Sequence, residues 1–330
     1  MNNNPDWSTV RPKLALDATA FIDSTRETDR ALNHYVLIDA AQVPELRDKR
    51  FLAAPFEHQN LFALTREHGI AKYGPLLCPV RAGQQSPAFM SALRAMRHGW
   101  TVSWLSSRLS PDTLAAHLAA NLNGTLADGT DVLVRFYDPR MLPHFLAHLD
   151  APGRDALLAP IAQWGWWDRT LKFVSTKGGD RDDPPRVNEI EVSAQAQQAL
   201  AASAMSELIK SMVIEASDAD EFSGWLPHAL SVAVDRQLEN ARKRSLTEVS
   251  DLQLYVSLAL RVHPDFFDLI PAFRHASEAL AAGDTDLTSL VLDVSDDEWD
   301  RVGGAGVPAL DLLREQINKS LYFTNLDTGN

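Results

Sequence analysis

The segment DVLVRFYDPRMLPHFL, residues 131–146, carries Arg135, Asp138 and Arg140 where an apolar run meets an Asp-Pro step. An earlier apolar run, YVLID, ends on Asp39. Carboxylates and guanidinium groups of this kind can form buried ion pairs, recognise a charged ligand, or supply a carboxyl group for acid–base catalysis. Three hypotheses stay open for these residues: a structural ion pair, which their types favour, a recognition pocket at the strand ends, and a catalytic site.

The Asp-Pro step predicts a helix start. Asp138 fits an N-cap and Pro139 a first helical residue, because the carboxylate can accept hydrogen bonds from the backbone N–H groups of Arg140 or Met141. The turn therefore makes structural sense without catalysis.

Residues 131–137 read as a strand that leads into this turn. Arg135 lies near the end of this strand, and side-chain alternation puts it on one of the two faces. We expect both faces to be covered. A guanidinium group in that position needs a carboxylate or carbonyl partner, and Asp39 is the first candidate.

The elements that position these residues alternate along the first half of the chain. Strand-like runs cover residues 35–41, 76–80, 101–105, 131–137 and 170–175. Helix-like segments separate them, one over residues 43–53, one across Pro87 to Arg97, and one that follows Ser110. Ser110 and Pro111 suit an N-cap and a first helical position. Strands separated by helices of this length predict a layered α/β lobe.

The pattern changes after Ser175. Residues 176–189, TKGGDRDDPPRVNE, are polar and rich in glycine and proline, as expected for a linker. Beyond them apolar residues recur at helical spacing, so we expect an all-α lobe. The predicted organisation is an N-terminal extension (1–33), an α/β domain (34–178) and a helical C-terminal lobe (190–330).

Other chemical motifs give little support to catalysis. Neither a phosphate-binding loop nor a nucleophile elbow occurs, so we expect no nucleotide, no cofactor and no enzyme activity. His144 and His148 could share a metal on one helix face, but no further ligand lies nearby, and a solvated face is the favoured interpretation. Cys78, the single cysteine, is expected to be buried. The acidic run 293–300 is interpreted as a helix N-terminus.

Charge and hydropathy limit the partners. The net charge of -13 opposes binding to nucleic acid or to anionic membranes. No apolar run approaches the length of a membrane span, and the N-terminus lacks the pattern of a signal peptide. We therefore expect a cytoplasmic protein without nucleic-acid or membrane partners.

Several blocks of the sequence resemble the effector-chaperone, or adaptor, domain of bacterial type VI secretion systems. These blocks are YVLIDAAQVP, YGPLLCPV, TVSWLSS, the stretch from LAAHLAANLNG to RFYDPRMLPHFL, and IAQWGWWDR. They extend over about residues 34–175, and LQLYVSLALRVHPDFFD in the helical lobe is similar only loosely. The resemblance implies an α/β domain followed by a variable helical lobe, which binds a cognate toxic effector and helps to load it on the secretion spike protein. It also implies that Asp39, Arg135, Asp138 and Arg140 correspond to residues of the family motifs, and that neither enzyme activity nor a cofactor is present.

Tryptophans are dense in WGWWD, residues 164–168. Aromatic side chains are enriched at binding hot spots, so Trp164 and Trp166 are candidates for partner contact, although burial at the junction of the two lobes is the favoured interpretation. An effector segment is expected to bind between the two lobes, in a crevice at the strand ends, with Arg140 as a charged contact. The alternative to the adaptor is an α/β enzyme of hydrolase or transferase type that uses Asp39, Arg135 and Asp138.

Overall fold

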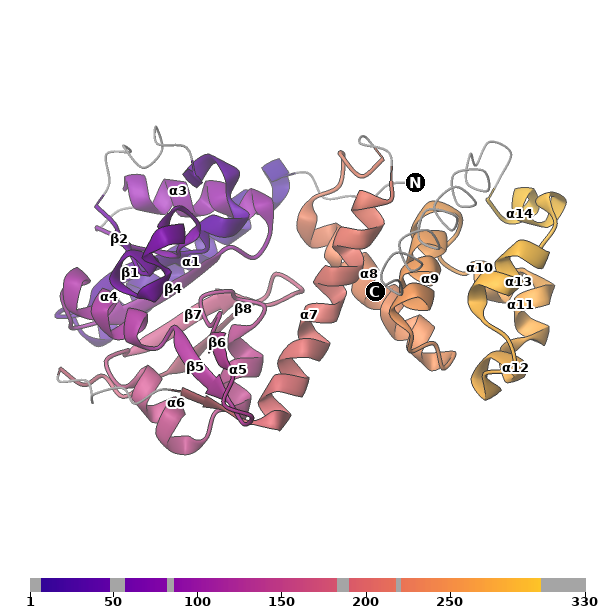
Figure 1. Cartoon of the computed structure of the whole chain (residues 1–330). Helices are drawn as coiled ribbons and strands as arrows, with labels where there is room; N and C mark the ends of the chain where they lie inside the picture. The colour runs from indigo at the N-terminus through magenta and orange to yellow at the C-terminus, as the bar shows by residue number, and fades with distance from the viewer. Residues whose placement is uncertain (1–6, 48–56, 82–85, 183–189, 218–220, 304–330) are drawn as a thin grey trace. The chain divides into compact units, whose positions relative to one another are not determined.

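The computed structural model describes residues 7–47, 57–81, 86–182, 190–217 and 221–303 (Figure 1). The chain forms two compact units. Unit 1 consists of Met1–Ala204 with Leu226–Ala229, and unit 2 of Met205–Trp225 with Leu230–Asn330. Unit 1 is built from sheets and helices and the described part of unit 2 from helices, which confirms the predicted fold class. The boundary at Ala204 lies beyond the predicted linker, of which residues 183–189 are outside the described residues.

The main sheet of unit 1 is antiparallel throughout, with the strand order β2-β3-β1-β4-β7-β8. Its strands are β1 (Asn33–Ile38), β2 (Gln59–Asn60), β3 (Leu76–Pro79), β4 (Val102–Ser107), β7 (Gln163–Trp167) and β8 (Phe173–Lys177). The expected crevice at the strand ends is a property of parallel sheets, whose carboxyl ends meet at one edge. That argument therefore does not hold for this sheet.

Both faces of the main sheet are covered, which explains why its central strands are apolar without a polar side. On β1, Val36 and Ile38 face a core shared with α1 (Trp7–Thr28) and α3 (Pro87–Ala95). Tyr35 and Leu37 face the opposite core, which contains α4 (Pro111–Ala120) and α5 (Leu142–His148). Helix α1, which lies in the segment predicted as an N-terminal extension, is thus a layer of unit 1 (Figure 1).

A second, smaller sheet has the order β6-β5-β9. It contains β5 (Asn123–Leu126), β6 (Asp131–Leu133) and β9 (Ile190–Val192), with β5 antiparallel to β6 and parallel to β9. The strand predicted over residues 131–137 is shorter than expected, because β6 ends at Leu133. It belongs to this smaller sheet. Its neighbours β5 and β9 were not predicted.

The start of α4 follows its local sequence signal. Ser110 caps α4 as predicted, accepting a hydrogen bond from the N–H of Thr113 at 3.3 Å. After β1 the chain forms the short 3-10 helices η1 (Ala40–Gln42) and η2 (Pro44–Arg47), whereas residues 48–53 of the helix expected there lie outside the described residues. The remaining elements of unit 1 are η3 (Phe62–Leu64), η4 (Arg66–Tyr73), η5 (Met96–His98) and α6 (Ala151–Leu158).

The described part of unit 2 is built from helices around its own core. The helices are α7 (Ala194–Glu215), which begins in unit 1, α8 (Pro227–Lys243), α9 (Val249–Arg261), α10 (Phe266–Leu269), α11 (Pro271–His275), α12 (Ser277–Ala282), α13 (Leu287–Asp293) and α14 (Asp296–Gly303). Leu252, Val256 and Ala259 of α9 are buried, as their spacing predicts. Asp296, Asp297 and Glu298 of the acidic run lie in the first turn of α14, as predicted, whereas Asp293 ends α13. No described helix has the length and apolar character that crossing a membrane requires.

Acid should destabilise unit 1 through His34, a buried residue of β1 whose Nε2 lies 2.7 Å from the Thr25 hydroxyl. The pKa of His34 is lowered from 6.5 to about 4, mainly by burial. The positive charge of Arg26 contributes a smaller part of this lowering, and the negative charge of Asp23 acts to raise the pKa. Between these values the unfolded chain binds a proton that the folded chain does not, so stability falls as pH falls, by up to about 3 kcal/mol. Urea denaturation across this range should show a shallower pH dependence for His34→Gln.

The matched control is His68→Gln, because His68 is exposed. It should retain the pH dependence of the parent chain. Equal slopes for the parent and His34→Gln would contradict the role of His34.

Candidate functional site

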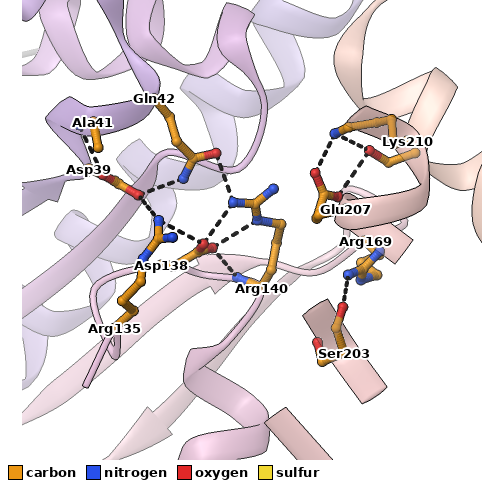
Figure 2. Close-up of polar contacts among 11 residues, drawn as sticks. Asp39, Ala41, Gln42, Arg135, Asp138, Arg140, Arg169, Ser203, Glu207 and Lys210 are labelled. Atoms are coloured by element: carbon orange, nitrogen blue, oxygen red, sulfur yellow. Dashed lines mark hydrogen bonds and ion pairs between the residues drawn. The ribbon is translucent and has the colours of Figure 1, made fainter. Parts of the chain in front are cut away.

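The charged residues singled out in the sequence meet in unit 1, in an arrangement that we call the ion-pair cluster: Asp39, Gln42, Arg135, Asp138 and Arg140 (Figure 2). Asp39 follows the last residue of β1, and its backbone N–H donates to the carbonyl of Thr101 at 2.8 Å, which fixes its position beside β4. The two arginines and Asp138 lie in the loop between β6 and α5. The cluster therefore joins the end of a central strand to a loop that follows the small sheet.

Asp39 is fully buried and accepts hydrogen bonds on both carboxylate oxygens. Its Oδ1 accepts from the N–H of Ala41 at 3.1 Å, which caps η1. Its Oδ2 accepts from the Gln42 side-chain amide at 2.6 Å and from Arg135 Nη2 at 3.0 Å. The pairing of Arg135 with Asp39 expected from the sequence is thus confirmed.

Asp138 forms the second half of the cluster and is 2% exposed. Arg140 approaches it with two groups, Nε to Oδ1 at 2.9 Å and Nη2 to Oδ2 at 2.7 Å, a bidentate geometry that strengthens the pair. Arg135 Nη2 lies 3.5 Å from the same Oδ2. The side-chain oxygen of Gln42 accepts from Arg140 Nη2 at 2.9 Å, so the Gln42 amide group joins Asp39 to Arg140.

The predicted helix N-cap at Asp138 is wrong, although the predicted hydrogen bond is present. Asp138 Oδ1 accepts from the N–H of Arg140 at 3.0 Å, and its carbonyl accepts from Met141 and Leu142. This is an Asx turn, and α5 begins only at Leu142, with Pro143 in its first turn. The physical reason is that the chain forms a turn after Asp138, closed by the hydrogen bond from the N–H of Met141 to the Asp138 carbonyl. Pro139 lies in this turn, and Pro143 is the proline in the first turn of α5.

The electrostatics of the cluster reflect its burial. Burial raises the pKa of the Asp39 carboxyl above its ordinary value, and Arg135 opposes this effect. Burial acts to lower the pKa of Arg135, but the carboxylates of Asp39 and Asp138 outweigh it and raise that pKa. Burial also raises the pKa of Tyr137, whose ring lies 5.8 Å from the Arg135 guanidinium carbon. Two carboxylates and two guanidinium groups balance in charge within the cluster.

Arg135 is the most exposed charged member of the cluster. Its side chain is 44% exposed, compared with 0% for Asp39 and 2% for Asp138. A partner molecule can therefore reach Arg135 more readily than either carboxylate, whose oxygens already accept hydrogen bonds. The arrangement favours a structural ion pair with one accessible cation.

The tryptophans expected near a partner lie inside unit 1. Trp164 and Trp166 are on β7, and their side chains enter the core that contains α4 and α5. Trp164 is fully buried, and its indole N–H donates to the Ser103 hydroxyl at 3.0 Å. The residue between them is Gly165, where an added Cβ would lie 2.6 Å from the Phe173 ring. Both tryptophans therefore belong to the packing of the main sheet.

Sequence reasoning missed Gln42 as a member of the cluster. Its signal was its position three residues after Asp39, within reach of the same carboxylate once η1 forms. Cys78 is buried as predicted, and burial raises the pKa of its thiol. Within the described ranges, no group of three or more His, Cys, Asp or Glu side chains has an arrangement that could hold a metal ion.

Residues 34–156 match the model of a protein family described as "Domain of unknown function (DUF4123)". This stretch begins in β1 and ends in α6, so it contains every residue of the ion-pair cluster but neither Trp164 nor Trp166. No curated protein and no solved structure matches the chain.

Proposed function

We propose that this protein is an adaptor of a bacterial type VI secretion system, which binds a cognate toxic effector and assists its loading on the spike protein. The observation that carries the proposal is the match of residues 34–156 to the DUF4123 family, which is commonly linked to effector adaptors of this system. Of the blocks that carry the resemblance, all but IAQWGWWDR lie in the matched stretch. Such an adaptor would act in the bacterial cytoplasm before secretion.

The geometry of the ion-pair cluster argues against a role of Asp39 in acid–base catalysis. A general acid or base must reach a proton of the substrate within hydrogen-bond distance, but Asp39 is fully buried and its oxygens accept from Ala41, Gln42 and Arg135. The raised pKa of Asp39 is the one observation that favours the enzyme alternative, because perturbed carboxyl groups gather at active sites. Desolvation in a structural ion pair accounts for it equally well.

The test is co-purification of the tagged full chain from its native host, followed by mass spectrometry. We expect a toxin-like protein and a spike protein, both encoded near this chain, among the proteins recovered. Deleting the gene for this chain should abolish secretion of that toxin while other substrates of the apparatus are still secreted. Unchanged toxin secretion in the deletion strain would refute the adaptor role, and recovery of metabolic enzymes alone would favour the enzyme alternative.

A further inference from the structure

A groove of about 840 Å³ lies at one end of the small sheet in unit 1. Strands β5 and β9 run parallel with Leu126 beside Val192, so their carboxyl ends meet at the same edge. The turn after β5, the start of α7, and the corner between α5 and α6 border the groove. Carboxyl ends of parallel strands commonly form a binding crevice, and this volume lies within the range of ligand sites.

Apolar side chains from three separate segments line the groove: Leu126 of β5, Leu149 of the α5–α6 corner and Val192 of β9. Leu126 and Leu149 are half-buried and pack against the core of unit 1, while Val192 belongs to that core. The groove therefore has an apolar surface that is continuous with the core of unit 1, and an apolar side chain placed there would be removed from water.

The charges around this apolar surface are acidic. Glu191 is exposed on β9, and Asp150 caps α6 through Oδ1, which accepts from the N–H of Gly153 at 2.8 Å. Neither lysine nor arginine occurs among the described residues that line the groove. The Nδ1 of His148 lies 2.8 Å from the carbonyl of His144 and must donate to it, which makes Nε2 an acceptor in the neutral ring. These side chains complement a hydrogen-bond donor or a cation.

We propose that this groove binds a short segment of the effector, in which an apolar side chain is followed closely by lysine or arginine. The inference rests on the proposed function and adds to it the place and the chemistry of recognition. The apolar side chain occupies the surface formed by Leu126, Leu149 and Val192, and the cation pairs with Glu191 and Asp150. Pairing of this cation with the two carboxylates would fix the orientation of the bound segment and would favour it over segments that lack a cation.

The affinity of the co-purified toxin for the parent chain and two groove variants, measured by calorimetry, tests this site. Glu191→Lys reverses a lining charge, and Gln195→Trp fills the groove from an exposed position at the start of α7. Each variant should bind about tenfold more weakly or worse. Glu27→Lys, an equal charge change on α1, and Gln197→Trp, a nearby exposed position of α7 outside the groove, should bind like the parent.

A cross-link identifies the segment directly. Cys78 is buried, and its raised thiol pKa leaves it unreactive, so the thiol of Gln195→Cys can be labelled selectively with a photoreactive maleimide. We expect the cross-linked toxin peptide to contain an apolar residue next to lysine or arginine. Replacing that cation with glutamate should restore binding to Glu191→Lys.

Three outcomes are decisive. Weakened binding in both groove variants, with a cationic cross-linked peptide, supports the inference. Affinities of both variants within about twofold of the parent, or a cross-linked peptide that lacks a cation, overturn the groove while leaving the adaptor role intact. A parent chain that binds no toxin counts against the adaptor role and the groove together.

Discussion

Replacing Asp138 with alanine is expected to lower the free energy of unfolding of unit 1 by about 3–5 kcal/mol. The variant loses the acceptor for the N–H of Arg140, which holds the turn, and both hydrogen bonds from the Arg140 guanidinium. A turn or cap alone contributes only about 1–2 kcal/mol, so the excess reports the cost of removing the carboxylate from beside the mostly buried Arg140 guanidinium. Chemical denaturation followed by circular dichroism gives the difference.

Asp138→Asn separates the two contributions, because it keeps an acceptor for the turn and removes the charge. We expect an intermediate loss for this variant. Asp131→Ala is the matched control, since Asp131 pairs with Arg66 at 2.7 Å but both side chains are about half exposed, and such pairs contribute about 0–1 kcal/mol. Similar losses for Asp138→Ala and Asp131→Ala would show that burial does not strengthen the cluster.

Replacing Trp164 with alanine should cost about 3–5 kcal/mol, because it removes a fully buried indole from the core of unit 1. The ring of Phe136 lies 6.0 Å from that of Trp164 in an edge-to-face arrangement, and this contact is lost as well. Trp164→Phe keeps an aromatic ring and loses mainly the hydrogen bond to Ser103, so it should cost clearly less. Urea denaturation followed by circular dichroism measures both variants.

The control for Trp164 is Leu16→Ala on α1, where the side chain is 66% exposed and a change within about 0.5 kcal/mol is expected. Trp164→Ala would show no loss of stability if the indole were an anchor for a partner rather than part of the core. Parent-like unfolding combined with lost toxin binding would therefore reinstate the interface interpretation.

The resemblance to the adaptor family, the start of α4 and the buried face of α9 could be predicted because each depends on residues that lie close together in the chain. Ser110 and Pro111 specify the start of α4 through hydrogen bonds and backbone angles within one turn. The spacing of Leu252, Val256 and Ala259 specifies the buried face of α9 in the same way. The partnership of Arg135 with Asp39 was predictable because a guanidinium group removed from water needs an acceptor, and few candidates end a strand.

Tertiary structure alone decided the rest, because strand pairing joins residues that are distant in the chain. The alternation of side chains along residues 131–137 contains no information about which sheet a strand enters. Pairing with β5 ends β6 at Leu133, two residues before Arg135. The same limit applies to Trp164 and Trp166, since a dense aromatic run reads alike at an interface and in a core. The sequence by itself determined the α/β and helical parts, the capped helix and the ion pair. Burial of β7 between β4 and β8 and the hydrogen bond from Arg140 to Gln42 followed only from long-range contacts, whose free energy no local pattern encodes.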